Sequence, residues 1–322
     1  MKRVLVATID VEPDCTLTWH YSNPLSFNAV YEGIGKILQP LFRKYNFTPT
    51  YLINNVVLED QKSVDLLSSL QSECELGAHL HPEFIAPGKE HNQYAGKKGV
   101  ANCCFYPPAI EFEKIKNITE LFSCKFGRLP TTFRAGRFSA GENTIKSLEK
   151  LGYLVDTSIT PHICWNDVTR QKPVDFSNAP EQPYWMENND ITRKAAHGKI
   201  LQVPVSIAQR KRNQFKELIS SGAGLLHPLR KYRNQWLRPY YSNAQEMKFI
   251  LEEYQSKYQQ EKVIVYNLMF HNVEVMPGLS PYTKNVQQTE AYLRELEKFL
   301  AHCSNTGITA SRLSDLYEVF RD

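Results

Sequence analysis

Two stretches of the sequence carry ionisable residues at alternate positions. Asp10 and Glu12 end one apolar run, and His79 and His81 end a second. Because side chains alternate across a strand, the members of each pair share one face if both stretches are extended. Carboxylate oxygens and imidazole nitrogens suit zinc or a similar divalent ion, which lowers the pKa of a bound water and makes it a nucleophile. The spacing therefore indicates hydrolytic chemistry.

Polar residues also end three further candidate strands. Arg134 follows an apolar run and precedes Ala-Gly-Arg, Asp156 precedes two hydroxyl side chains, and His271 ends a long apolar run. Glu274 and Tyr282 come shortly after and could shape a pocket or order their own loop. One polar residue at a strand end is usually a satisfied group at the rim of the core, whereas five such strand ends predict a shared site.

Apolar runs that could be strands alternate with stretches of helical periodicity, which is the pattern of a mainly parallel sheet covered by helices. The expected strands are residues 4–9, 49–53, 75–78, 130–133, 154–156, 200–205 and 263–270. The expected helices are residues 28–44, 60–70, 110–122, 143–151, 285–303 and 311–320, together with one that Ser242 or Asn243 could cap and that runs towards Tyr258. An α/β fold with a barrel or a strongly curved sheet accommodates this order.

Composition limits the class of protein. A chain of 322 residues with 42% hydrophobic residues can bury a large core, and we expect a single domain over residues 1–322. A net charge of +4 is too small to indicate a nucleic-acid binder, and seven irregularly spaced cysteines indicate reduced thiols. No apolar run approaches the roughly 20 residues of a membrane span, and the first residues lead straight into a strand. We expect a soluble, cytoplasmic protein without a transmembrane segment.

Two insertions, at about residues 161–199 and 209–241, interrupt the alternation. The first is polar but contains Trp165, Tyr184 and Trp185, which indicates a long ordered loop that folds over the site. The second mixes aromatic residues with basic ones. Its basic residues are Arg210, Lys211, Arg212, Lys216, Arg230, Lys231, Arg233 and Arg238. They fit either a solvated surface or a dock for an anionic part of a substrate, such as a diphosphate, or for a membrane surface in a peripheral contact.

The five motifs, taken together and in this order, resemble those of the polysaccharide deacetylase superfamily, also called the NodB-homology or carbohydrate esterase 4 fold. The resemblance is stronger to its divergent branch found with surface-polysaccharide biosynthesis, including that of lipopolysaccharide. The matching segments are residues 8–12, 75–82, 133–136, 156–158 and 270–271. The resemblance covers nearly the whole chain and implies a distorted (β/α) barrel of about seven strands, which agrees with the separate strand count.

The resemblance also implies roles for the polar residues at these strand ends. Asp10 would be the general base that activates water, and His271 would be the general acid that protonates the leaving amine. Arg134 would orient Asp10, and Asp156 would hold Arg134 or His271.

The implied metal ligands depart from the usual family pattern. Glu12 and His79 would bind the ion, although the usual second acid directly follows the first, where this chain has Val11. The usual second histidine lies four residues after the first, where this chain has Glu83. His81 is the favoured third ligand because it shares a face with His79, and Glu83 is the alternative. Zinc is the expected ion, with cobalt and nickel as alternatives.

Three functions follow from these patterns. The first is metal-dependent removal of an N-acyl group, acetyl above all, from a sugar that could be linked to a nucleotide or a lipid phosphate. The second is a non-catalytic glycan-binding or scaffold relative, because two usual ligand positions are altered. The third is a hydrolase of a small non-sugar amide. A broad groove lined by Trp165, Trp185 or Trp236 would favour sugars, and a closed small cavity would favour a small amide.

Overall fold

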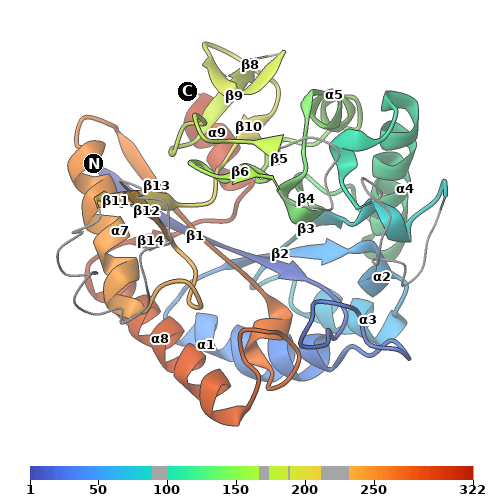
Figure 1. Cartoon of the computed structure of the whole chain (residues 1–322), viewed down its shortest axis with the longest axis horizontal. Coiled ribbons are helices and arrows are strands. Elements are labelled where there is room, and N and C mark those ends of the chain that lie inside the picture. Colours follow the sequence, from blue (N-terminus) through green and yellow to red (C-terminus); the bar gives the residue numbers. More distant parts are fainter. Residues whose placement is uncertain (89–100, 167–173, 188, 212–231, 322) are drawn as a thin grey trace, which may run out of the picture.

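A computed structural model describes residues 1–88, 101–166, 174–187, 189–211 and 232–321. At its centre, seven parallel strands lie side by side in one curled sheet (Figure 1). In spatial order they are β13 (Val263–His271), β1 (Lys2–Val11), β2 (Pro49–Asn54), β3 (Glu75–Leu80), β4 (Thr132–Ala135), β5 (Val155–Asp156) and β10 (Leu201–Gln202). These are the seven strands expected from the sequence. The expected α/β class with a strongly curved, mainly parallel sheet is confirmed.

The segment that follows β10 contacts β13 by hydrogen bonds that lie outside the strand ladder. The Ser206 N–H donates to the carbonyl oxygen of Asn267 (3.2 Å), and the Asn267 N–H donates to the Ser206 hydroxyl (2.8 Å). The Asn267 amide also donates to the Val203 carbonyl (3.2 Å). A few hydrogen bonds thus join the segment after β10 to β13. They form because buried backbone groups need partners even where strands diverge.

Helices surround the sheet in Figure 1 and cover its outer face. The longer ones are a π-helix η1 (Ala29–Leu38) continued by α1 (Gln39–Lys44), then α3 (Gln61–Ser69), α4 (Pro108–Phe126), α5 (Glu142–Lys150), α7 (Ala244–Lys257), α8 (Val286–Asn305) and α9 (Asp315–Arg321). All of the predicted helices are present within a few residues. Asn243 and Asn285 cap α7 and α8 by accepting backbone N–H groups three residues on, which explains where these helices begin.

The core lies between these helices and the strands. Residues 4–11 of β1 are all buried, which is expected of a central parallel strand with both faces covered. Gly77 on β3 allows the neighbouring strand to approach, since an added Cβ would lie 2.1 Å from the Thr132 hydroxyl oxygen. All seven cysteines are free. Within the described ranges, no helix has both the length and the apolar character that a membrane span requires.

The first insertion differs from the expected loop. It forms two antiparallel hairpins, β6 (Cys164–Trp165) with β7 (Val174–Asp175) and β8 (Tyr184–Glu187) with β9 (Asp190–Ala195). β8 also pairs antiparallel with β10 and so extends the main sheet. The loop prediction was wrong because aromatic side chains of alternate burial, as in β8, favour extended pairs that satisfy one another's backbone groups.

The second insertion contains a further antiparallel pair, β11 (Ile207–Lys211) with β12 (Tyr232–Trp236). Four of the basic residues noted in this insertion, Arg212, Lys216, Arg230 and Lys231, lie outside the described residues. The remaining short elements are α2 (Asn55–Leu58), η2 (Pro82–Phe84), η3 (Cys103–Phe105), η4 (Gly136–Phe138), η5 (Asn272–Val275) and β14 (Thr309–Ala310). Several of them follow the carboxyl ends of barrel strands and carry side chains of the site.

Candidate active site

The carboxyl ends of the parallel strands meet at one edge of the barrel, and a cavity of about 300 Å³ lies there. Asp10 and Glu12 come from the end of β1, His79 and His81 from the end of β3, and His271 from the end of β13. The other lining residues are Trp19, Arg137, Phe138, Trp165, Arg238, Tyr241 and Tyr282. The barrel therefore brings together the five ionisable residues that the sequence separates by more than 250 positions.

Glu12, His79 and His81 form a compact three-ligand cluster. The Glu12 Oε1 atom lies 3.3 Å from His79 Nε2 and 3.0 Å from His81 Nε2, and the two nitrogens are 3.2 Å apart. None of the three residues is more than 6% exposed. A carboxylate oxygen and two imidazole nitrogens at this separation could hold a divalent metal ion.

The outer nitrogens of both rings have partners that fix their orientation. The His79 Nδ1–H donates to the Arg134 carbonyl (3.1 Å), which leaves the Nε2 lone pair facing the cluster. His81 Nδ1 lies 3.6 Å from Glu83, on the opposite side of the ring from the cluster, and Arg137 Nη1 donates to Glu83 (2.8 Å). In this arrangement Glu83 supports His81 and does not reach the position of a third ligand.

The charges within the cluster reinforce one another. Burial opposes the charged form of Glu12, but His81 and hydrogen bonds from both rings lower its pKa well below the usual range. Burial likewise opposes protonation of His81, and the Glu12 and Glu83 carboxylates raise its pKa to about 9. Gly136 allows this packing, since a Cβ there would lie 2.9 Å from His81 Cδ2 and 2.8 Å from the Leu80 carbonyl oxygen.

Asp10 sits beside the cluster and is held by a buried arginine. Arg134 Nη1 donates to Asp10 Oδ1 (2.7 Å), and the same guanidinium donates to the Thr8 hydroxyl (2.7 Å) and the Thr157 carbonyl (2.9 Å). Burial would raise the pKa of Asp10, but Arg134, with the adjacent histidines, lowers it below its ordinary value. Asp10 is therefore an anion at neutral pH.

His271 faces the other oxygen of Asp10. Its Nε2 lies 3.7 Å from Asp10 Oδ2, and its Nδ1–H donates to Glu274 Oε1 (2.8 Å). Glu274 is fully buried and also accepts hydrogen bonds from Arg238 and, at 3.1 Å, from the Tyr292 hydroxyl. Burial opposes its ionisation, but Arg238 and His271 lower the pKa of Glu274. An anionic Glu274 thus fixes which nitrogen of His271 faces the cavity.

Asp156 is not where the sequence motif suggested. In the described part of the chain, Asp156 does not line the cavity. Its carboxylate accepts hydrogen bonds from the Ser158 hydroxyl (2.6 Å) and the Ser158 N–H (3.0 Å), and the expected hydrogen bond to Arg134 is made by Thr157 instead. Burial raises the pKa of Asp156 to about 6. The Asp156 carboxylate is fully buried, and the groups that hold it lie two residues further along the same segment.

Several cavity residues had no assigned role from the sequence. They are Trp19, Arg137, Phe138 and Tyr241, whereas Arg238 was one of the basic residues considered for an anion dock. Three of them, Trp19, Arg137 and Phe138, adopt positive φ values of 61°, 54° and 52°, a strained region for side-chain-bearing residues that is often found at functional sites. Arg137 and Phe138 directly follow the motif at residues 133–136, whereas nothing in the composition around Trp19 marked it.

The comparisons with known proteins agree with this architecture. No family model matches the sequence, and no curated protein matches it significantly. A glycoside hydrolase/deacetylase structure from Parabacteroides distasonis superposes with a TM-score of 0.64 at 11% identity, covering 99% of this chain and 71% of the other. A structure named as a polysaccharide deacetylase from Mycobacterium smegmatis gives 0.53 at 12% identity, covering 99% and 90%. An allantoinase gives 0.52 at 13%, covering 99% and 90%.

The barrel and its strand-end site define the class of fold. The chain has the NodB-like fold that is shared with structures named as polysaccharide deacetylases and with an allantoinase. At these levels of identity the likeness concerns the fold alone, so the chemistry has to be argued from the residues of the cavity.

Proposed function

We propose that this protein is a metal-dependent hydrolase that removes an N-acyl group, acetyl above all, from a sugar. The observation that carries the proposal is the three-ligand cluster of Glu12, His79 and His81 beside an arginine-held Asp10, with His271 facing the same carboxylate. A ligand set, a base and an acid on one cavity wall are the groups that amide hydrolysis needs. The fold shared with polysaccharide deacetylases supports the choice of an acylated sugar.

Each residue has one task in this reaction. Glu12, His79 and His81 would hold the ion, which when bound polarises the amide carbonyl and acidifies water. Asp10, ionised and held by Arg134, takes the proton of the attacking water as the carbon–oxygen bond forms. His271 gives a proton from Nε2 to the nitrogen as the carbon–nitrogen bond breaks, because an unprotonated amine leaves poorly. Glu274 keeps the Nδ1 proton in place and stabilises the charged ring.

The ion and the substrate carrier are assigned on chemical grounds. Two imidazoles and one carboxylate suit zinc, with cobalt and nickel as alternatives. The five motifs resemble those of the branch found with surface-polysaccharide biosynthesis. This supports an acylated sugar precursor as substrate and an enzyme that acts in the cytoplasm. A nucleotide or lipid-phosphate carrier is part of that proposal.

Metal analysis of the purified protein tests the proposal most directly. We expect one equivalent of bound ion in the wild type, lost in Glu12→Ala and His79→Ala but kept in His162→Ala, whose ring pairs with Glu181 elsewhere in the fold (2.6 Å). Acetate release from a panel of N-acetylated sugars should follow the metal content. A metal-free wild-type protein that still binds glycans would sink the enzyme proposal and favour a glycan-binding role.

A small non-sugar amide is the second candidate substrate. The compact cavity and the fold shared with an allantoinase favour it. Hydrolysis of allantoin or similar cyclic amides, with no acetate released from any acetylated sugar, would select this alternative.

A further inference from the structure

Six aromatic rings follow one another around the cavity and form what we call the aromatic arc. Their order is Trp19, Tyr282, Tyr241, Trp236, Trp165 and Phe138. Successive ring centroids are 5.3, 5.7, 5.6, 6.2 and 5.7 Å apart, which is contact distance for aromatic pairs. Five of the six rings line the cavity directly, and Trp236 joins the two halves from behind.

The arc is assembled from segments that are distant in the sequence. Trp19 follows β1, Phe138 belongs to η4, Trp165 to β6 in the first insertion and Trp236 to β12 in the second. Both insertions therefore contribute rings to the same cavity. The same cavity is lined by Asp10 and the three-ligand cluster, and the Trp19 end of the arc lies 5.0 Å from the His271 ring, so the aromatic rings adjoin the reactive groups.

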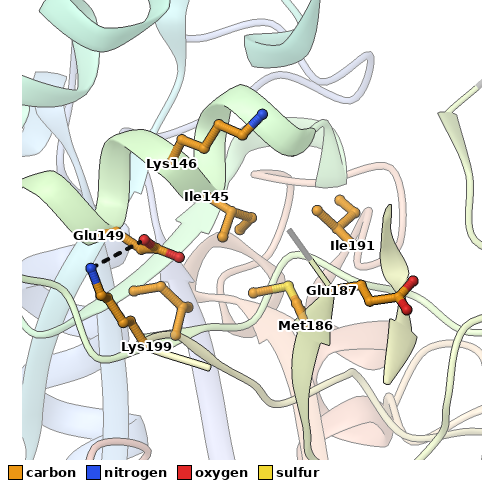
Figure 2. A pocket seen from close by; sticks show the side chains of 8 residues that line it. Ile145, Lys146, Glu149, Met186, Glu187, Ile191 and Lys199 are labelled. Atoms are coloured by element: carbon orange, nitrogen blue, oxygen red, sulfur yellow. Dashed lines mark ion pairs between the residues drawn. The ribbon is translucent and has the colours of Figure 1, made fainter. Parts of the chain in front are cut away.

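A second pocket, which Figure 2 shows, differs from this cavity. It has a volume of about 220 Å³, lies between α5 and the β8–β9 pair, and shares no lining residue with the strand-end cavity. Aliphatic and charged side chains line it, among them Ile145, Met186 and the ion pair of Lys199 with Glu149 (3.9 Å). Aromatic rings thus line the strand-end cavity but not this second pocket.

The two arginines of the cavity carry charges that are already compensated. Arg137 pairs with Glu83 and Arg238 with Glu274, and both acids are buried. Arg238 also lies 5.0 Å from the ring centres of Tyr241 and Tyr282. Such paired guanidiniums can donate hydrogen bonds to hydroxyl groups but provide little net attraction for an anion. The cavity is therefore built for a neutral ring.

Resting on the proposed function, we infer that the unit recognised is one acylated sugar ring, free or at the end of a longer molecule, and not an internal unit of a polymer. The apolar face of the ring stacks on the aromatic arc, and its acyl group meets the three-ligand cluster. A volume of about 300 Å³ lies at the lower end of the range for ligand cavities, about 300–1,000 Å³, and holds one such ring. Among the described residues, a cavity of this volume has room for one ring and not for a row of them.

Binding of deacylated products tests this inference separately from hydrolysis. The probes are glucosamine, galactosamine and mannosamine, together with the tetrasaccharide of glucosamine, titrated into the metal-loaded protein. Three of the four tryptophans belong to the arc, so intrinsic fluorescence reports the binding, and Trp185, which packs against Tyr317, provides the control position. We expect at least one monosaccharide to bind and the tetrasaccharide to bind no more than threefold tighter than glucosamine.

Three outcomes would overturn the inference, and they differ from failure of the proposed function. The first is a tetrasaccharide that binds more than tenfold tighter than glucosamine. The second is hydrolysis of internal units of an acetylated polymer at the rate of single sugars. The third is binding of no monosaccharide by a protein that holds its metal. Loss of metal together with loss of all hydrolysis would instead count against the proposed function.

Substitutions in the aromatic arc add a second readout. Trp165→Leu and Tyr282→Leu should weaken monosaccharide binding by roughly three- to tenfold, because each removes one stacking surface. Tyr282→Phe keeps the ring and should bind within twofold of wild type, and Trp185→Leu should leave binding unchanged. Circular dichroism and metal content show whether each variant is folded. Folded, metal-replete Leu variants with wild-type affinity would contradict the assignment.

Discussion

Two barrel strands, β1 and β5, each end in a buried aspartate, yet the two carboxylates have opposite properties. Asp10 on β1 accepts a hydrogen bond from Arg134, and its pKa is lowered although burial opposes this. Asp156 on β5 has Ser158 as its partner, and burial raises its pKa to about 6. Only the first lines the cavity among the described residues. A strand-end position brings an acid to the edge of the barrel, but a cationic partner decides whether it is charged there.

Arg134 hydrogen-bonds to groups at the ends of both strands, but the kind of group differs. Its Nη1 donates to the Asp10 carboxylate, whereas its Nε donates to the backbone carbonyl of Thr157 beside Asp156. The positive charge of Arg134 therefore stabilises the Asp10 carboxylate, whereas at the end of β5 Arg134 only binds a backbone carbonyl. Substitutions at these positions should separate the two roles.

Replacement of Asp10 should have the largest effect. Asp10→Asn removes the proton acceptor, and we expect turnover to fall by about 10²- to 10⁴-fold with the metal retained. Steady-state kinetics on the best N-acetylated substrate, with metal content measured on the same sample, checks this. Asp156→Asn serves as the matched control, since it makes the same chemical change at the end of another strand. Equal losses in both variants would remove the distinction between them.

Loss of Arg134 should affect stability most. Arg134→Met leaves Asp10 as an unpaired buried charge, and we expect unfolding free energy to fall by about 3–5 kcal/mol. Adding Asp10→Asn removes that charge and should restore part of the loss. Urea unfolding of the two single variants and the double variant gives the coupling energy. Additive losses would show that Arg134 stabilises the barrel through its threonine partners alone.

Glu274 is a third buried acid, and like Asp10 it is paired with an arginine, Arg238. Glu274→Gln keeps the size of the side chain but removes the charge that orients His271, and turnover should fall by about 10- to 100-fold. The Michaelis constant should change much less, because the acid acts in the transition state. Gln replacement at the exposed Glu261 is the control. A loss confined to the Michaelis constant would place Glu274 in substrate binding instead.

The smallest kinetic effect is expected at Asp156. Asp156→Asn should alter turnover by less than about threefold, because the side chain lies outside the cavity. Its effect on stability should depend on pH. The folded state holds its proton up to a pKa of about 6, whereas an unfolded aspartate loses it near 3.8, so wild-type stability falls as pH rises between these values.

The asparagine variant lacks this titration, so its stability relative to wild type should rise across the same pH window. The difference should be on the order of 2 kcal/mol and level off above pH 6. Urea unfolding of both proteins at several values between pH 4 and 7 measures it. A difference that stays constant with pH would mean that Asp156 is ionised in the folded protein, as Asp10 is.

Much of the fold follows from local patterns. The seven parallel strands were predictable because apolar runs of three to eight residues alternate with helical periodicity, and a parallel sheet buries both faces. The two insertions were harder to interpret, because the short strands β6 to β9 depend on partners that are distant along the chain. A two-residue strand such as β6 has too few residues to show a period.

The candidate site was predictable in part for the same reason. Asp10, Glu12, His79 and His81 are strand-end residues with alternate spacing, and parallel strands place their carboxyl ends together. The choice between His81 and Glu83 needed the structure, because it depends on which side of an imidazole ring a carboxylate lies. That the cavity lining in the described part of the chain lacks Asp156, whose carboxylate is bound by Ser158, likewise needed the structure.

The sequence by itself determined the barrel and the set of reactive groups, because alternation and apolar runs act over a few neighbouring residues. Only the tertiary structure decided which groups work together. Arg134 lies 124 residues along the chain from Asp10, whose ionised form it stabilises. The rings of the aromatic arc come from segments between Trp19 and Tyr282. Such contacts depend on how strands and insertions close in space, and no local spacing encodes that.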